Sequence, residues 1–331
     1  MSTGEFDALN DEMLRELFRI NPDAGTRFGM HDPYDGMLPH GGFTRIEQTS
    51  DLLTSWLRRA EKVAASEELD HEGEISLEVL RMSEGMLRFA RHDYPLWQIF
   101  PEATEVPGGS LLLMFAREYA TPERKASWMS SRIGEIPRYL EEFRTRFRPG
   151  RPAREWTAMS IASAKGLPKF LDFLDRHYNG KVPPGAGAGL SKNVARAKEA
   201  MGEHLEWLVS LEEHSVPGFA MGRDNLAKLL RLRGYGQTPE QVLAFGEASL
   251  KALKAERDAV SAEMAPGRPP GDAVEMMRAD SPADFDQAFA EAKAEVERAR
   301  RFITDNDLVT LDYDAELHVM ETPSFMSGMI P

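Results

Sequence analysis

Apolar residues recur every three or four positions along most of the chain before Asp307, which is the spacing of one face of an α-helix. In the first predicted helix this face carries Phe6, Leu9, Met13 and Leu17. The same spacing predicts further helices with these apolar markers: Leu52, Leu53, Trp56 and Leu57; Ile75, Val79, Met82, Met86 and Phe89; Val242, Phe245, Leu250 and Leu253; Phe285, Phe289, Val296 and Phe302. Since no internal repeat of fixed period is present, the pattern indicates a large irregular helical array and not a solenoid.

The pattern changes after Asp307. Leu308–Leu311 and Leu317–Met320 are short runs rich in residues that favour strands, and the polar segment Asp312–Ala315 separates them. We therefore predict a β-hairpin at this end. An isolated hairpin is marginally stable in water, so we expect that further strands or a helix outside this chain complete a small sheet. The predicted fold class is mainly α, with a small β element at the C-terminal end.

One segment has the composition of a linker. Pro183–Gly189 consists of two prolines followed by alternating glycine and alanine, and such clusters interrupt regular structure. We predict an N-terminal helical part over 1–184, a second helical part over 185–305, and the start of a small β-sheet over 306–331.

Composition excludes several classes of protein. The formal net charge of −14 repels phosphate backbones, so nucleic acid is not an expected partner, although solubility accounts for most of this acidity. The absence of cysteine excludes disulfides, thiolate metal sites and a cysteine nucleophile. The first residues lack the apolar core of a signal peptide, and no apolar run approaches the ~18 residues of a membrane span. We expect a cytoplasmic protein that does not contact membranes.

Few residues have the spacing of a metal or catalytic site. His71-Glu72 begins like the zinc motif H-E-x-x-H, but Ile75 stands where the second histidine is required. Glu199 and Glu203 share a helix face, which is more often a solvated stripe than a site. We therefore assign no catalytic residue and no metal ligand.

The loop from Gly29 to Gly36 is the stronger candidate for binding. It brings polar, aromatic and flexible residues together, as binding loops do, and its candidates are His31, Asp32 and Tyr34. The competing interpretation is a tight turn in which aspartate side chains bond to the backbone.

Three segments in order resemble a known family. Asn21–Asp32, Gly234–Glu247 and Ala299–Phe325 together resemble the prokaryotic family catalogued as domain of unknown function 885. Its members look like helical zinc metallopeptidases, similar in fold to thermostable Taq-type carboxypeptidases. The resemblance implies that the helices wall a deep groove, and that the complete protein holds zinc through an H-E-x-x-H helix and a further glutamate downstream.

This implied zinc site has no counterpart in the chain. No H-E-x-x-H occurs in the sequence, and in the family the motif lies beyond the segment with which these residues end. We therefore expect that this chain binds no zinc by itself. An exposed strand edge binds extended peptides, so the substrate-groove candidates are His318, Met320, Glu321 and Thr322, although a role in packing the sheet is the commoner one for such residues.

Three hypotheses follow. The first is the N-terminal, substrate-channel portion of a zinc-dependent, carboxypeptidase-like hydrolase, inactive by itself, whose partners are a peptide or small-molecule substrate and a missing C-terminal segment. The second is a non-catalytic binding or assembly subunit of a split protein, with a partner chain supplying that segment. The third is an independent helical protein that binds a ligand with the Gly29–Gly36 loop.

Overall fold

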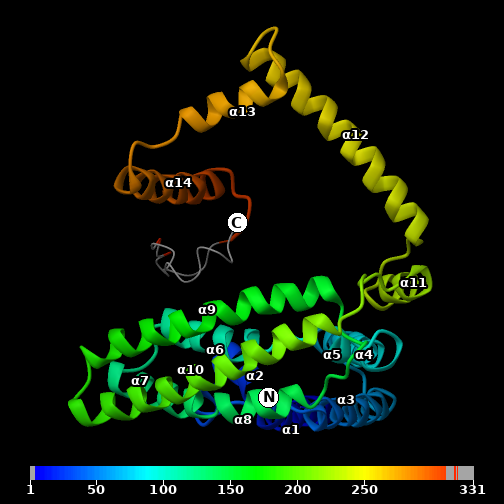
Figure 1. Cartoon of the computed structure of the whole chain (residues 1–331). Coiled ribbons are helices and arrows are strands. Elements are labelled where there is room, and N and C mark those ends of the chain that lie inside the picture. Colours follow the sequence, from blue (N-terminus) through cyan, green and yellow to red (C-terminus); the bar gives the residue numbers. More distant parts are fainter. Residues whose placement is uncertain (1–3, 311–316, 318, 320–331) are drawn as a thin grey trace. The chain divides into compact units, whose positions relative to one another are not determined.

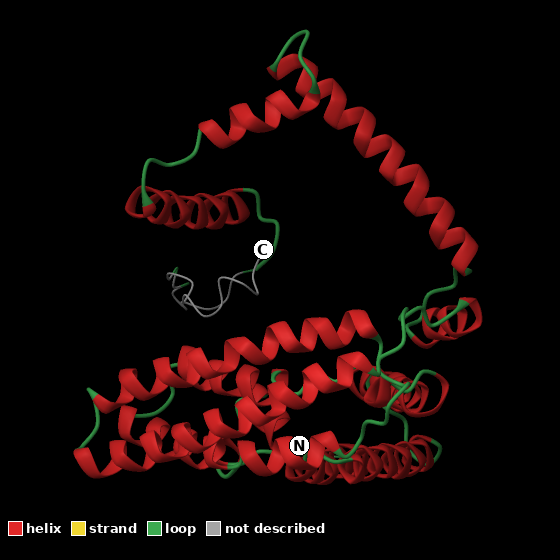
Figure 2. Ribbon diagram, in the orientation of Figure 1, coloured by secondary structure: helices red, strands yellow, loops and turns green. Residues whose placement is uncertain are grey.

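The computed structural model describes residues 4–310 together with 317 and 319. The named elements in these residues are all helical, and the chain divides into two compact units, Met1–Gly236 and Gln237–Pro331. Figure 1 labels the elements along the chain and Figure 2 shows the loops that join them.

The first unit contains most of the helices. They are α1 (Glu5–Ile20), α2 (Pro22–Arg27), the short η1 (Tyr34–Gly36), α3 (Phe43–Ala64), α4 (His71–Arg88), η2 (Phe89–Asp93), α5 (Leu96–Ile99), α6 (Glu105–Ala116), α7 (Pro122–Gly134), α8 (Ile136–Arg144), α9 (Arg154–Asn179), α10 (Pro184–Glu213) and α11 (Arg223–Leu232). Helices α9 and α10 lie side by side over much of their length, and α10 also packs on α7 and α8 (Figure 1).

Two apolar clusters hold this unit together. One joins α1, α3 and α4 through Phe6, Leu9, Trp56 and Leu80, and Trp56 Nε1 also donates a 2.9 Å hydrogen bond to Asn10 Oδ1. The other consists of fully buried side chains on helices α6 to α10: Leu111, Met114, Met129, Ile133, Ile136, Tyr139, Leu140, Leu171, Leu174, Leu190 and Met201. Each fully buried aliphatic side chain stabilises the fold by roughly 1.5–3 kcal/mol.

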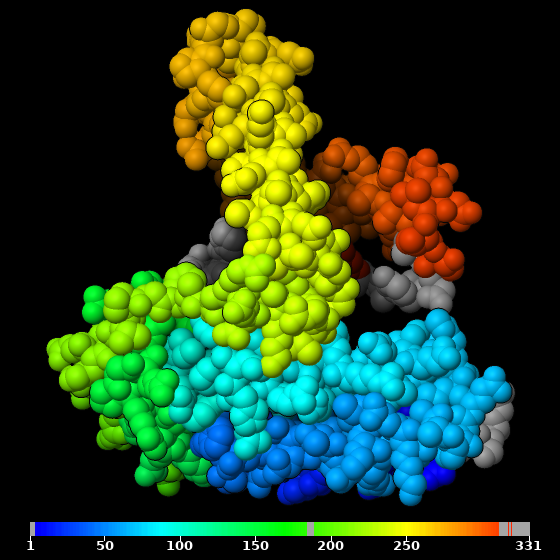
Figure 3. Space-filling model, turned by 90° about the vertical axis from the view of Figure 1, so that its right-hand side faces the viewer, coloured from blue at the N-terminus to red at the C-terminus, as the bar shows by residue number. Residues whose placement is uncertain are grey.

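The second unit contains α12 (Pro239–Met264), α13 (Pro270–Ala279) and α14 (Phe285–Asp305). Thr238 and Gln241 form a reciprocal capping box at the start of α12, with proline at the first helical position. Few of its described side chains are buried: Ser261, Ala265 and Ala273. In Figure 3 the atoms of α12, drawn in yellow, lie open on the face that this view presents.

The β-hairpin predicted after Asp307 is wrong for the residues that the structure describes. Asp307 has a φ of +48°, and the N–H groups of Asp307 and Leu308 bond to the carbonyls of Thr304 and Ile303. This pattern is a Schellman motif, which ends α14 by satisfying its last carbonyl groups. Leu308–Thr310, predicted as strand, therefore serve as the exit from a helix, and the rest of the predicted hairpin lies outside the described residues.

The segment predicted as a linker is also helical. The predicted start of this helix is Ser191, because serine is a preferred N-cap residue. In the structure α10 begins seven residues earlier, at Pro184. Proline suits the first helical position because its missing N–H has no partner there in any helix. Leu190 and Val194, which are both buried, then anchor the helix against its neighbours.

Candidate functional site

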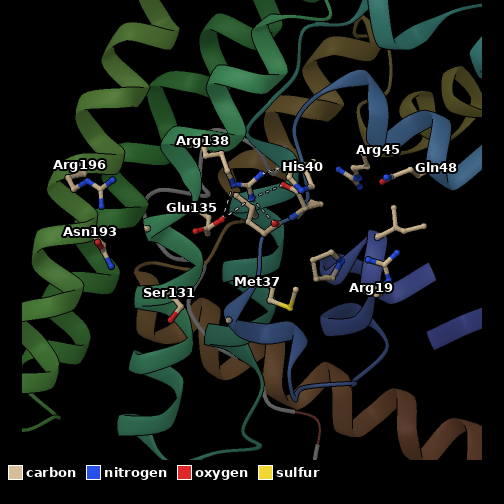
Figure 4. Close-up of a pocket in the computed structure, with 16 residues that line it drawn as sticks. Arg19, Met37, His40, Arg45, Gln48, Ser131, Glu135, Arg138, Asn193 and Arg196 are labelled. Atoms are coloured by element: carbon tan, nitrogen blue, oxygen red, sulfur yellow. Dashed lines mark hydrogen bonds and ion pairs between the residues drawn. The ribbon is translucent and has the colours of Figure 1, made fainter. Parts of the chain in front are cut away.

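A pocket of about 780 Å³ lies in the first unit. Its lining comes from the end of α1, the loop after η1, and helices α3, α7, α8 and α10. Figure 4 shows how side chains from these elements surround it. The polar and charged residues of the lining are Arg19, His40, Arg45, Gln48, Ser131, Glu135, Arg138, Asn193 and Arg196. The lining has four arginines and one glutamate, and the carboxylates of Glu16, Asp23 and Glu142 beside it pair with Arg19, Arg45 and Arg138.

Arg138 is the most firmly held of these arginines. Its Nε donates to Glu135 Oε2 at 2.9 Å, its Nη1 donates to Glu142 Oε2 at 3.0 Å, and its Nη2 donates to the Leu38 carbonyl at 3.0 Å. These bonds tie the loop after η1 to α8. They fix the guanidinium before any ligand arrives.

Glu142 bonds to His40 and Gly41 in the same loop. Its carboxylate lies 3.1 Å from His40 Nδ1 and accepts a 2.8 Å bond from the Gly41 N–H. Burial opposes ionisation of Glu142, but the hydrogen bonds from His40, Gly41 and Arg138 outweigh it and lower the carboxyl pKa. Glu142 is therefore an ionised anchor for the pocket loop at neutral pH.

Gly41 sits against the backbone of α8. A Cβ placed on it would lie 2.0 Å from the Tyr139 carbonyl oxygen, well inside contact distance. Only a residue without a side chain fits this approach, so Gly41 sets how closely the pocket loop lies to the helix.

The remaining three arginines differ in how tightly they are held. Arg45 Nε donates to Asn21 Oδ1 at 2.7 Å, and its side chain is only 17% exposed. Arg19 pairs with Glu16 at 2.6 Å near the surface. Arg196 is exposed and has no ion pair or side-chain hydrogen bond within the described part of the chain. Arg19, Arg45 and Arg138 are thus each held by a neighbouring side chain, whereas Arg196 is free to adjust to a ligand.

The predicted binding loop surrounds a buried carboxylate. Asp35 is fully buried and accepts hydrogen bonds from Thr26 Oγ1 at 2.7 Å and from the Tyr119 hydroxyl at 2.5 Å, and His31 Nδ1 lies 3.0 Å away. The ring of His31 stacks on Tyr119 with a centroid distance of 3.5 Å. Burial, and then the bond to Asp35, raise the pKa of the Tyr119 phenol. These partners of Asp35 are side chains, whereas the competing interpretation expected aspartate bonds to the backbone.

A buried arginine completes this cluster. Arg132 Nη2 donates to Thr26 Oγ1 and to the Tyr34 carbonyl, both at 2.7 Å. Burial lowers the pKa of Arg132 to about 10, which still leaves it charged at neutral pH. The network links the loop to α2 and α7, and so supports the segment that goes on to line the pocket.

The three predicted loop residues have separate surroundings. His31 is held by Asp35, Asp32 forms an exposed 2.7 Å ion pair with Arg124, and the Tyr34 ring packs on Phe18. None of them lines the 780 Å³ pocket, whose loop contribution begins at Gly36. The other four candidates, His318, Met320, Glu321 and Thr322, lie outside the described residues.

Sequence reasoning missed the arginines of the pocket. Arg19, Arg45, Arg138 and Arg196 lie far apart in the sequence and share no motif. The sequence feature that comes closest to predicting the pocket is the Gly- and Pro-rich loop after Gly29, because its later part, from Gly36 to His40, lines the pocket.

The described residues do not fit the zinc site that the resemblance implies. His71 and Glu72 are exposed at the start of α4, and no group of three histidine, aspartate or glutamate side chains in the described ranges is placed to hold a metal ion. Glu203 lies 3.8 Å from Arg144 at the surface, in agreement with a solvated stripe.

Comparison with known proteins gives a family but no activity. Residues 22–331 match the family described as "Bacterial protein of unknown function (DUF885)". No curated protein matches the chain. Among solved structures, the chain is similar to a protein from Shewanella oneidensis that is described as a candidate lipoprotein of unknown function. The TM-score is 0.64 and the identity 16%, with 97% of this chain and 61% of that chain covered.

Two facts bound the use of this likeness. At this identity it shows a shared fold alone, and the chain spans 61% of the length of that protein. Among the described helices, none is both long and apolar enough to cross a lipid bilayer. A cytoplasmic location stays a prediction.

Proposed function

Because the chain belongs to the DUF885 family of bacterial proteins, we propose that it is the helical, substrate-binding part of a zinc-dependent, carboxypeptidase-like hydrolase. In this proposal the zinc is held by residues outside the chain, since no H-E-x-x-H occurs in its sequence. The chain supplies a helical wall and a polar pocket for the substrate.

The observation that carries the proposal is the exposed apolar side of the second unit. On α12, Val242, Phe245, Leu253 and Val260 recur at helical spacing on one side, and all four are exposed. Contiguous apolar surfaces of this kind mark sites where another protein segment packs. The 61% coverage of the Shewanella oneidensis protein supports the same view, because a protein of that fold is longer than this chain.

The second candidate is a non-catalytic binding or assembly subunit, whose partner is a separate chain. The same apolar side of α12 favours it, because a partner chain covers such a surface as well as a segment of the same chain does. The two candidates differ in one observation. An in-frame H-E-x-x-H encoded after Pro331 supports the hydrolase, and a stop codon directly after it supports the assembly subunit.

The experiment compares two lengths of chain. Bound zinc and hydrolysis of a peptide library are measured for residues 1–331 and for a chain extended beyond Pro331 by the following coding sequence. The proposal expects zinc and turnover in the longer chain alone. Zinc-dependent turnover by the 331-residue chain, or neither zinc nor turnover in the longer one, contradicts it.

A pair of variants tests the apolar side directly. Leu253 lies on the apolar side of α12, and Lys251 lies about 200° away around the helix. Leu253→Gln is expected to lower the unfolding midpoint of the longer chain but not of the 331-residue chain. Lys251→Gln, the matched control, is expected to leave both midpoints unchanged. Equal effects of the two variants in the longer chain count against the proposed packing.

A further inference from the structure

The arginine-lined pocket of the first unit has features of a site for an organic anion. We propose that it binds an acidic peptide through the carboxylate groups of that peptide. This inference rests on the proposed function, in which the chain binds the substrate, and it names the substrate class.

The first argument is the arrangement of the guanidinium groups. Figure 4 shows Arg138 and Arg45 on different sides of the pocket, with Arg196 entering from α10. A guanidinium presents a planar fork of donors that matches the two oxygens of a carboxylate. The exposed Arg196 has no ion-pair or side-chain hydrogen-bond partner in the described part of the chain, so all its donors are available.

The second argument is preorganisation. Arg138 is fixed by Glu135, Glu142 and the Leu38 carbonyl, and Arg45 by Asn21. These side chains therefore lose little conformational entropy when a ligand binds, whereas a mobile arginine loses rotamer entropy. Arg19 is likewise held by Glu16, so three fixed arginines define the shape of the site and the unpaired Arg196 closes on the ligand.

The third argument separates a peptide carboxylate from a small inorganic ion. The pocket volume of about 780 Å³ is in the range of sites for organic ligands. Ile20, Met37 and Leu38 give it apolar walls for side-chain carbon atoms. The carboxylates of Glu135 and Glu142 remain beside Arg138, and they repel a dianion such as phosphate more strongly than a single carboxylate.

The test measures binding to the 331-residue chain, without zinc and without turnover. The probe is a fluorescently labelled hexapeptide of alternating glutamate and alanine, followed by anisotropy. A hexapeptide of alternating lysine and alanine, and inorganic phosphate as a competitor, are the comparisons. We expect the acidic peptide to bind, its affinity to fall as salt rises, and the lysine peptide not to bind.

Two arginine variants make the test specific to the pocket. Arg196→Ala is expected to weaken binding of the acidic peptide about ten-fold, as the loss of one charge-assisted contact does. Arg151→Ala removes an exposed arginine of the same unit outside the pocket, and it is expected to leave affinity unchanged. Tryptophan fluorescence during unfolding checks that both variants fold like the parent, as expected because both side chains are exposed.

Several results overturn the inference. Equal affinities of Arg196→Ala and Arg151→Ala place any binding outside the pocket. Equal binding of the acidic and lysine peptides removes the charge argument, and displacement of the acidic peptide by phosphate as effectively as by the unlabelled peptide assigns the site to an inorganic ion. If the longer chain hydrolyses peptides while the acidic peptide does not bind, the inference fails and the proposed function stands.

Discussion

The two units of the chain use the same apolar periodicity with opposite results. In the first unit Leu171 on α9 is fully buried, whereas in the second unit Leu250 on α12 is 54% exposed and Phe245 is 76% exposed. Both leucines lie in helices whose sequence pattern is amphipathic. The difference shows that periodicity predicts the helix and its apolar side, while burial depends on whether another element covers that side.

The first unit contains an exception that makes the same point. On α4, Leu77 and Leu80 are buried against α1 and α3, but the predicted markers Ile75, Val79 and Met82 are exposed. Helix α4 thus has apolar residues on two sides and only one of them is covered in the described structure.

The largest expected contrast comes from truncating one leucine in each unit. Leu171→Ala removes a fully buried side chain and is expected to cost about 2–5 kcal/mol of unfolding free energy, including the cavity it leaves. Leu250→Ala at an exposed site is expected to change it by less than about 0.5 kcal/mol. Denaturant titration followed by circular dichroism measures both. A large cost for Leu250→Ala would show that the second unit buries this residue in solution.

A second contrast uses two glycines. Gly41→Ala places a Cβ 2.0 Å from the Tyr139 carbonyl and is expected to destabilise the first unit by about 3 kcal/mol, since backbone must move. Gly246→Ala in α12 meets nothing within 4 Å and is expected to stabilise that helix by roughly 0.5–1 kcal/mol.

The readout for these glycine variants separates the units. All tryptophans of the chain, Trp56, Trp97, Trp128, Trp156 and Trp207, lie in the first unit. Tryptophan fluorescence should therefore follow Gly41→Ala, whereas Gly246→Ala should change only the circular dichroism transition. A fluorescence midpoint unchanged by Gly41→Ala contradicts the tight approach of the pocket loop to α8.

Acid should loosen the first unit alone. His204 is fully buried beside Trp207, and in the described structure neither ring nitrogen has a hydrogen-bond partner. Burial, and then the charge of Arg144, lower the pKa of His204 to about 4, below its ordinary 6.5. The neutral form is therefore favoured by folding, so stability is complete above about pH 6.5 and falls as pH drops toward 4. The loss is about 3 kcal/mol at 1.36 kcal/mol per unit of pKa.

The acid effect is measured by tryptophan fluorescence unfolding between pH 7 and pH 4. His204→Leu should remove this part of the pH dependence, and His71→Gln, at an exposed histidine, should retain it. Residues 237–310 contain no histidine, so the second unit offers no equivalent group there. An unchanged acid profile in His204→Leu would contradict the assignment.

The smallest effect is expected at the start of α12. Thr238→Ala removes the side chain that accepts from the Gln241 N–H and should cost about 1 kcal/mol of local helix stability. Hydrogen exchange of the first α12 amides should speed up, while amides of the first unit stay unchanged. Unchanged exchange in α12 would mean that the capping box does not limit fraying.

Local signals predicted much of this architecture. The cap at Thr238, the apolar side of α1 and the membership of the family, inferred from three ordered segments, are confirmed. These features depend on residues within a few positions of one another, or on the linear order of segments. The zinc site, the acidic peptide and the cytoplasmic location stay predictions.

The errors arose where a local signal had two physical solutions. Leu308–Thr310 has the composition of a strand, but Asp307 in the left-handed conformation makes Leu308 part of a helix cap. The glycines after Pro184 have the composition of a linker, but the burial of Leu190 and Val194 favours helix there. In each case a backbone conformation or a tertiary contact decided the structure, and the composition of the segment does not predict either.

The sequence by itself determined most of the helical segments and which side of each is apolar, because both follow from interactions between residues three or four positions apart. Only the tertiary structure decided which of those sides are buried. It also decided that Arg45, Arg138 and Arg196 line one pocket, because their meeting depends on how α3, α8 and α10 pack. Packing between distant helices depends on contacts across the whole unit, which no local spacing encodes.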